Sequence, residues 1–171
     1  MIEKEFNKVK LFSGVIYRET ENYNRVKKML EKDFSEIDYE SNEIPFVFTN
    51  YYNNEMGTPL YRKFLSFSKK IQPEKLSGIK ILTNSIESSM MIAGKRVVNI
   101  DPGYISDANV IIATAKNYYH RVPLSNGIYA HIEYVIKNKK FYFLEWTYPD
   151  FKTQEYLVFF RKLKELYKSG R

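Results

Sequence analysis

The sequence predicts a single α+β domain in which an antiparallel sheet carries packed helices. Three observations support this. Apolar segments with strand-like alternation are interspersed with three segments of helical spacing, and the first six elements run strand, helix, strand, strand, helix, strand. That order matches the split βαβ pattern of ferredoxin-like domains. A chain of 171 residues is also close to the common size of one domain. We therefore expect one domain over 1–171, with a ferredoxin-like βαββαβ core extended by a C-terminal β-hairpin and a terminal helix.

The first strand is expected over 8–18. Its apolar side chains occupy both alternations, which is typical of a central strand covered on both faces: Val9, Leu11, Val15 and Tyr17 on one, Phe12 and Ile16 on the other. A helix follows from Thr20 to Phe34, because Thr20-Glu21-Asn22 resembles a helix N-cap with acid in the first turn. Residues 37–43 are expected to form a polar linker, and 45–49 a short strand opened by its proline.

The middle of the chain continues with a polar and aromatic loop over 50–57 and a strand over 60–68. A second helix is expected to begin at Gln72-Pro73-Glu74, since proline is favoured in the first turn. Its buried stripe runs from Leu76 to Met90, and Gly94 is a suitable end.

The last elements begin with strands over 96–100 and 109–114, on either side of a turn at Asp101-Pro102-Gly103. A hairpin follows, with strands over 128–137 and 140–147 around Asn138-Lys139. A final amphipathic helix is expected over 153–168.

Composition limits the chemistry. The absence of cysteine excludes disulfides, thiolate nucleophiles, cysteine-containing zinc sites and iron–sulfur clusters. No P-loop, dinucleotide-binding glycine motif or nucleophile elbow is present. No apolar run approaches the ~20 residues that span a bilayer, and the N-terminal residues carry acids rather than a signal-peptide core. We expect a cytoplasmic protein that does not insert into membranes.

The charge balance bears on partners. The chain has 27 Lys and Arg against 20 Asp and Glu, a formal charge of +7. Such a surplus attracts polyanions at long range. It favours an anionic small molecule or a nucleic acid as partner, although a basic surface on helix faces is also compatible with solvation alone.

The hairpin register predicts an unusual carboxylate. A two-residue loop at Asn138-Lys139 places Ile136 opposite Phe141, Tyr134 opposite Phe143, and Ile132 opposite Glu145. Glu145 would then lie on an apolar face, where burial raises a carboxyl pKa. The alternative is a position at the sheet end, where the side chain reaches solvent. On the other face, His131 is expected opposite Trp146.

Two further clusters contain candidate functional groups. Asn99 and Asp101 share one side of their strand, close to Tyr104, although an Asp before Pro-Gly also organises turns. Lys116, His120 and Arg121 follow an apolar strand and could hold an anion, and histidine can transfer protons near neutral pH. A solvated basic loop explains this second cluster equally well.

Other polar residues complete the set of candidates. Asn84 and Glu87 lie near Lys80 on the second helix, a pattern also typical of a solvated face. Glu55 could join Asp101 and His120 around a metal, but no spacing resembles a known local metal motif. The sequence therefore assigns neither a metal nor a cofactor.

Several blocks of the sequence resemble a known family. These are FTNYYNNEMG (48–57), TNSIE (83–87), VNIDPGYI (98–105), HRVPLSNGIYAHIEY (120–134) and WTYPDF (146–151). They are similar to a bacterial family catalogued as domain of unknown function 4416, for which the resemblance implies no particular activity. The blocks contain the same polar residues that stand out locally: Glu55, Asn84, Glu87, Asn99, Asp101, His120, Arg121, Glu145 and Asp150. Brought together at strand ends, these residues would form a mixed-charge pocket.

Three functions remain open at this point. The first is a binding protein for an anionic ligand, a nucleotide or nucleic acid, with Lys116, His120 and Arg121 as anion contacts and Tyr51, Tyr52 or Trp146 as stacking platforms. The second is a hydrolase- or transferase-type enzyme that uses Asp101, His120 and Glu145 as catalytic acid and base, with or without a metal. The third is a non-enzymatic interaction or scaffold protein whose aromatic residues form only the core.

Overall fold

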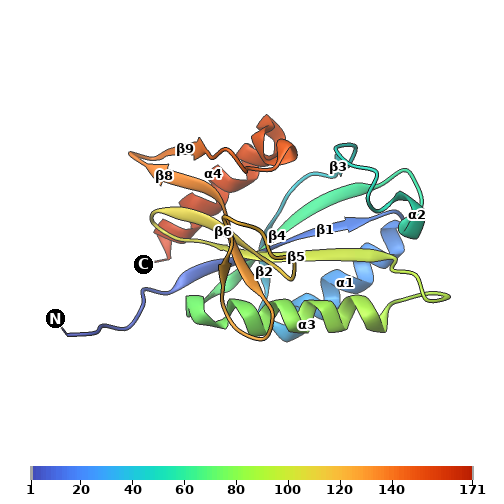
Figure 1. Ribbon diagram of the computed structural model, residues 1–171, viewed down its shortest axis with the longest axis horizontal. Helices are drawn as coiled ribbons and strands as arrows, with labels where there is room; N and C mark the ends of the chain where they lie inside the picture. Colours follow the sequence, from blue (N-terminus) through green and yellow to red (C-terminus); the bar gives the residue numbers. More distant parts are fainter. Residues whose placement is uncertain (1, 171) are drawn as a thin grey trace.

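The computed structural model describes residues 2–170, which form one antiparallel sheet with helices on both faces (Figure 1). The strands are β1 (Val9–Tyr17), β2 (Ile37–Glu40), β3 (Ile44–Pro45), β4 (Tyr61–Ile71), β5 (Val98–Ile105), β6 (Asn109–Thr114), β7 (Val122–Pro123), β8 (Tyr129–Lys137) and β9 (Lys140–Phe143). The helices are α1 (Thr20–Asp33), α2 (Asn53–Met56), α3 (Leu76–Ser89) and α4 (Gln154–Ser169), with 3-10 turns η1 (Pro73–Lys75) and η2 (Pro149–Lys152).

The combination of helices with an antiparallel sheet confirms the α+β class. The sheet has nine strands in the order β2-β4-β1-β5-β6-β8-β7, with β3 added to β4 and β9 added to β8. This is larger than the four-stranded sheet expected of a ferredoxin-like core, and its overall order is different. The sheet continues past β5 because β6 pairs with β5 and the hairpin then extends it through β8.

Strand β1 lies at the centre of the sheet, as its double apolar alternation predicts. It pairs with β4 on one side and β5 on the other, and every one of its residues is buried. Leu11 and Val15 pack with side chains of α1 and α3, whereas Phe12 packs with α4 on the opposite face. The helices therefore cover both faces, with α1 and α3 beneath the sheet and α4 above it in Figure 1.

The face beneath α4 holds the dense aromatic core. Phe64 lies at its centre, stacked on Phe159 at 5.0 Å between ring centroids and meeting Phe160 edge-on at 5.4 Å. Phe12, Phe151 and Tyr156 also contact its ring. Edge-to-face and offset pairs of this kind add to the stabilisation that burial alone provides.

Two predicted segments differ in the structure. The expected linker over 37–43 contains β2, and the expected strand over 45–49 is reduced to β3. β2 is an edge strand in which the apolar Ile37 and Tyr39 pack against the core while Asp38 and Glu40 bind neighbouring side chains. Asp38 accepts hydrogen bonds from Lys10 and Ser66, and Glu40 accepts one from Tyr23 at 2.7 Å.

The turn predicted at Asp101-Pro102-Gly103 is wrong, because β5 runs straight through these residues. β5 pairs with β1 from Val98 to Ile105 but with β6 only from Gly103 onwards. Pro102 lies on the edge that faces β6 and has no N–H to continue the ladder. At Gly103 the strands approach so closely that a Cβ atom would collide with the carbonyl oxygen of Ile111. β5 and β6 are therefore close at one end and separate at the other.

Side chains of helix α3 hydrogen-bond to β5 where it is separated from β6. The backbone N–H of Ile100 donates to Glu87 at 2.6 Å, and the Ile100 carbonyl accepts from Lys80 at 2.7 Å. These two side chains supply the hydrogen bonds that a neighbouring strand would otherwise make. The helix itself follows η1 and ends at Ser89, before the predicted Gly94.

The C-terminal hairpin has the predicted register up to Phe143, with Tyr134 opposite Phe143 and Ile136 opposite Phe141. The expected pairing of Ile132 with Glu145 is wrong, because β9 ends at Phe143 and Glu145 is exposed. The indole N–H of Trp146 instead donates to the Ile132 carbonyl at 2.9 Å, so a side chain takes the bond that a longer strand would have made. None of the helices within residues 2–170 is long and apolar enough to cross a membrane.

Candidate functional site

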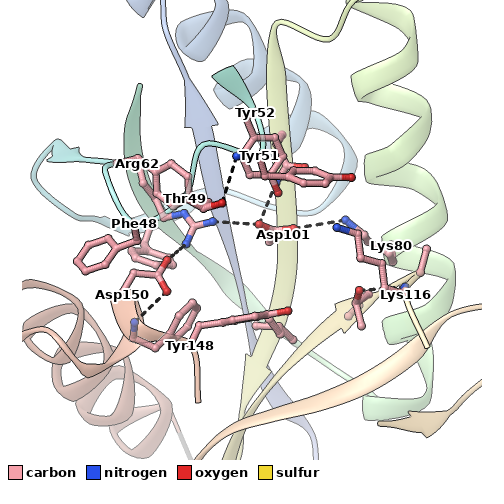
Figure 2. Close-up of a pocket in the computed structure, with 18 of the residues that line it drawn as sticks. Phe48, Thr49, Tyr51, Tyr52, Arg62, Lys80, Asp101, Lys116, Tyr148 and Asp150 are labelled. Atoms are coloured by element: carbon pink, nitrogen blue, oxygen red, sulfur yellow. Dashed lines mark hydrogen bonds and ion pairs between the residues drawn. The ribbon is translucent and has the colours of Figure 1, made fainter. Parts of the chain in front are cut away.

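A pocket of about 650 Å³ opens where β5 and β6 separate. Its lining comes from both faces of the sheet: α3 supplies Lys80, Asn84 and Glu87, while β4 and η2 supply Arg62 and Asp150. Asn99 and Asp101 of β5 and the segment 112–116 form the edges of the opening, and the loop 46–52 borders it. Figure 2 shows the labelled side chains of this pocket converging from these separate elements.

Arg62 is a buried cation of the pocket, with only 5% of its surface exposed. Its guanidinium donates to Asp150 at 2.8 Å, to the Tyr156 hydroxyl at 3.2 Å and to Asp101 at 3.2 Å. Burial disfavours the charged form, but Tyr156, Asp150 and Asp101 outweigh burial and raise the Arg62 pKa. Arg62 therefore joins β4, β5 and η2 through one charged network (Figure 2).

Arg96 anchors the opposite end of the pocket. It binds both carboxylate oxygens of Glu55, with nitrogen–oxygen distances of 2.9 and 2.7 Å, and donates to Asn99 at 3.1 Å. The hydrogen bonds from Arg96 lower the pKa of Glu55. Glu87 lies 3.5 Å from Arg96, and burial raises the Glu87 pKa against the opposing effect of Lys80. This end is consequently well neutralised by its own groups.

The two lysines of the pocket differ in their partners. The Lys80 amine donates to the Ile100 carbonyl and lies 3.6 Å from an Asp101 oxygen. Lys116 is exposed, lies 3.9 Å from the ring centroid of Tyr51, and has no carboxylate partner among residues 2–170. Lys116 is thus the pocket cation whose charge is left for a ligand.

Aromatic rings form much of the wall. Phe46 lies 4.7 Å from the Arg62 guanidinium, and Tyr52 lies 5.6 Å from that of Arg96. Phe48 and Tyr51 are 44% and 59% exposed at the mouth. Rings in such positions can stack on a planar ligand while cations hold its charged group.

Tyr148 forms one wall, and a buried cluster holds it in place. Its ring stacks on His131 with 5.0 Å between centroids and 5° between planes, and its hydroxyl accepts from Arg121 at 2.6 Å. Its backbone N–H donates to Glu133 at 3.2 Å. These residues are apart in the sequence, but the pairing of β7 with β8 and the return of the chain through 144–148 bring them together.

The same cluster fixes the protonation of His131. Arg121 donates its Nε–H to His131 Nδ1 at 3.1 Å, and His120 Nε2 lies 3.0 Å from the same atom. His131 Nε2 lies 3.0 Å from Glu133 Oε1 without the alignment of a hydrogen bond. Burial, followed by the charge of Arg121, lowers the His131 pKa to about 4. Burial also raises the pKa of Glu133 well above its usual range.

The depressed His131 pKa predicts an acid-sensitive fold. The unfolded chain takes up a proton at His131 near pH 6.5, whereas the folded chain does so only near pH 4. The stability that neutral His131 contributes is therefore complete above about pH 6.5 and lost as the pH falls towards 4. When the pH is lowered from 7 to 4.5, the free energy of unfolding measured in urea is expected to fall less for a His131→Asn variant than for wild type. The difference between the two decreases is expected to be on the order of 2 kcal/mol. Equal losses in both proteins would contradict this assignment.

Some of the site residues predicted from the sequence line the pocket, and others lie elsewhere. Six of them line the pocket: Asn84, Glu87, Asn99, Asp101, Lys116 and Asp150. Glu55 and Arg121 each bind a residue that lines the pocket: Glu55 accepts from Arg96, and Arg121 donates to Tyr148. Tyr104 lies in a different apolar cluster, beside Leu76 and Ile111.

The proposed catalytic trio is not brought together. Asp101 is in the pocket, whereas His120 stacks on Trp146 with 4.7 Å between centroids and Glu145 is exposed. His131 contacts Tyr148 rather than lying against Trp146 as expected. Within residues 2–170, no group of three or more His, Asp or Glu side chains is arranged to hold a metal ion.

Sequence reasoning missed several residues of the site. Arg62 is the clearest, but β4 also contains Lys63, Lys69 and Lys70, so the sequence alone does not single Arg62 out as the buried cation. Glu133 gives a stronger signal, since it is a carboxylate between Ile132 and Tyr134 in a largely apolar strand and a buried charge needs a partner. Arg96 and Tyr148 carry no comparable local signal, because their roles depend on Glu55 and Arg121.

Comparison with known proteins identifies the family. A family model described as "Domain of unknown function (DUF4416)" matches residues 7–167. No curated protein and no solved structure matches the chain. Because the match spans nearly the whole sequence, including every element that lines the pocket, the chain belongs to the DUF4416 family.

Proposed function

We propose that this protein binds a nucleotide in the pocket between β5 and β6, with the phosphate at Lys116 and the base against the aromatic wall. The observation that carries the proposal is the placement of Lys116. It is a lysine at the pocket with no carboxylate partner in the described chain, and it lies directly over the Tyr51 ring. A ligand that joins an anionic group to a planar ring can pair with the Lys116 amine and stack on the nearby aromatic rings at the same time.

The charge of the pocket supports an anion. Its lining has four cations, Arg62, Lys80, Arg96 and Lys116, and three carboxyl groups, those of Glu87, Asp101 and Asp150. Glu55, just outside the lining, pairs with Arg96, so the charges balance except at Lys116, which is exposed and has no carboxylate partner in the described chain. The unopposed charge of Lys116 attracts an anion to the mouth of the pocket.

The size and polar lining support a ligand with a base. A volume of about 650 Å³ lies within the usual range for small-molecule sites. Asn84 and Thr49 line the pocket and offer an amide and a hydroxyl group for the edge of a base. Carboxylate oxygens of Asp101 can accept from an exocyclic amine.

A nucleoside monophosphate titration tests the proposal. Lys116→Gln is expected to weaken binding about tenfold, because it removes one charge-assisted contact worth roughly 1.5–3 kcal/mol. Lys139→Gln, which removes an exposed lysine in the β8–β9 turn, should leave affinity unchanged. Calorimetry of the nucleotide, the matching nucleoside and inorganic phosphate against each protein provides the measurement.

The outcomes separate clearly. The nucleoside should bind wild type more weakly than the nucleotide, and Lys116→Gln should largely abolish the difference. The proposal fails if no nucleotide binds wild type at low salt, or if both lysine variants weaken binding equally.

We also propose that the portion of the sheet formed by β2, β4, β1 and β5, together with α1 and α3, is a ferredoxin-like core to which the later strands were added. The order β2-β4-β1-β5 and the packing of both helices on one face support this. In that description the pocket lies where the core meets its extension.

A further inference from the structure

Two loops at the mouth of the pocket expose aromatic rings to solvent. We call these two loops, residues 46–52 and 115–121, the rim. Phe48 and Tyr51 of the first loop are 44% and 59% exposed, and Tyr118 and Tyr119 of the second are 58% and 73% exposed. Neighbouring aromatic rings held in water are typical of binding surfaces rather than of a solvated loop.

The two loops form one continuous surface with the pocket. Lys116 of the second loop lies over the Tyr51 ring of the first, and both residues line the pocket. Tyr118 and Tyr119 lie two and three residues after Lys116, with 4.8 Å between their ring centroids. A ligand that leaves the pocket past Lys116 therefore meets these tyrosines next.

One cation, Arg121, and a histidine whose pKa is lowered by burial accompany the rings. Arg121 lies 6.0 Å from the Tyr118 ring centroid, and His120 packs edge-on against Tyr119 at 5.1 Å. The sequence has no Asp or Glu from 108 to 132 and none from 44 to 54, so neither loop brings an acid to this surface. Aromatic rings interleaved with unopposed cations favour a polyanion that also carries flat apolar rings.

Single-stranded nucleic acid has this chemistry. Its bases can stack on exposed tyrosines while its phosphates lie against Lys116 and Arg121. A duplex hides its base faces in the helical stack, and an apolar protein partner would gain nothing from the cations.

We propose that the rim binds single-stranded nucleic acid, with one nucleotide in the pocket and the neighbouring bases stacked on Tyr118 and Tyr119. This inference rests on the proposed nucleotide site, because the pocket supplies the first contact of the strand.

A length series tests the inference. Affinities of thymidine monophosphate and of oligothymidylates of two, four and eight nucleotides are measured by calorimetry or by anisotropy competition at low salt. Affinity is expected to rise about tenfold or more from the mononucleotide to the tetranucleotide, because the added bases stack on Tyr118 and Tyr119.

A paired variant separates the rim from the pocket. Tyr118→Ser combined with Tyr119→Ser is expected to lower tetranucleotide affinity about tenfold while mononucleotide affinity stays unchanged. Tyr142→Ser removes an exposed tyrosine on β9, outside the rim, and serves as the control with no expected effect.

Three results would overturn the inference. If mononucleotide binds but longer strands bind no more tightly, the rim proposal fails while the proposed pocket function stands. If neither binds, both fail. Equal affinity for a blunt duplex, or an equal loss with Tyr142→Ser, shows general charge attraction in place of stacking and rejects the rim as a single-strand site.

Discussion

Replacing Arg62 with methionine is expected to lower the free energy of unfolding by about 3–5 kcal/mol, the range for removing one partner of a buried ion pair. Arg62 is 5% exposed and donates to both Asp150 and Asp101. Methionine retains most of the packing against Phe46 but leaves the two carboxylates without their common cation. Asp150 would then be left with neutral donors only, from Tyr156 and the Phe151 backbone, whereas Asp101 would keep Lys80 at 3.6 Å, so the largest cost falls on the buried Asp150.

The measurement is equilibrium urea unfolding at neutral pH. Arg161→Met removes an exposed arginine of α4 and is expected to change stability by less than about 0.5 kcal/mol. Arg62→Lys retains the charge but not the fork that reaches two carboxylates, so it should fall between wild type and Arg62→Met. An Arg62→Met variant as stable as Arg161→Met would show that the network contributes nothing to folding.

Replacing Phe64 with alanine is expected to destabilise the fold by a similar amount, about 3–5 kcal/mol. Phe64 is 1% exposed and contacts the rings of Phe159, Phe160 and Tyr156. Removal of its ring leaves a cavity between β4 and α4, and the surrounding rings cannot close it without losing their own contacts. The loss therefore combines the transfer free energy of the ring with the cost of the cavity.

Thermal and urea unfolding measure this loss. Phe64→Leu is the matched variant, because it retains most of the buried volume while removing the aromatic contacts, and it should be clearly less destabilised than Phe64→Ala. If Phe64→Leu and Phe64→Ala destabilise the fold equally, the contribution of Phe64 comes from its aromatic contacts and not from its buried volume. A loss below about 1 kcal/mol for alanine would contradict the central position of Phe64.

Elements with strong local periodicity were predictable from the sequence. β1 has apolar residues on both alternations, and its predicted central position follows from that pattern. The turn predicted at Asp101-Pro102-Gly103 is wrong for a physical reason. Its turn propensity is local, but pairing with β1 along the whole of β5 and the hydrogen bonds from Lys80 and Glu87 to Ile100 override it.

The pocket was only partly predictable. Asp101 and Lys116 stand out because each follows a strand predicted from an apolar run, and both line the pocket. Their arrangement depends on partners far along the chain. Arg62 and Asp150 are 88 residues apart in sequence yet 2.8 Å apart in space. Glu145 was misplaced because a register projected from the hairpin loop does not show where β9 ends.

A crystal structure of the protein with a nucleoside monophosphate tests the central proposal most directly. The proposal predicts the phosphate within hydrogen-bonding distance of the Lys116 amine and the base among the rings of Phe48, Tyr51 and Tyr148, between β5 and β6. A nucleotide bound elsewhere on the protein, or an empty pocket at a nucleotide concentration that saturates binding in solution, would contradict it.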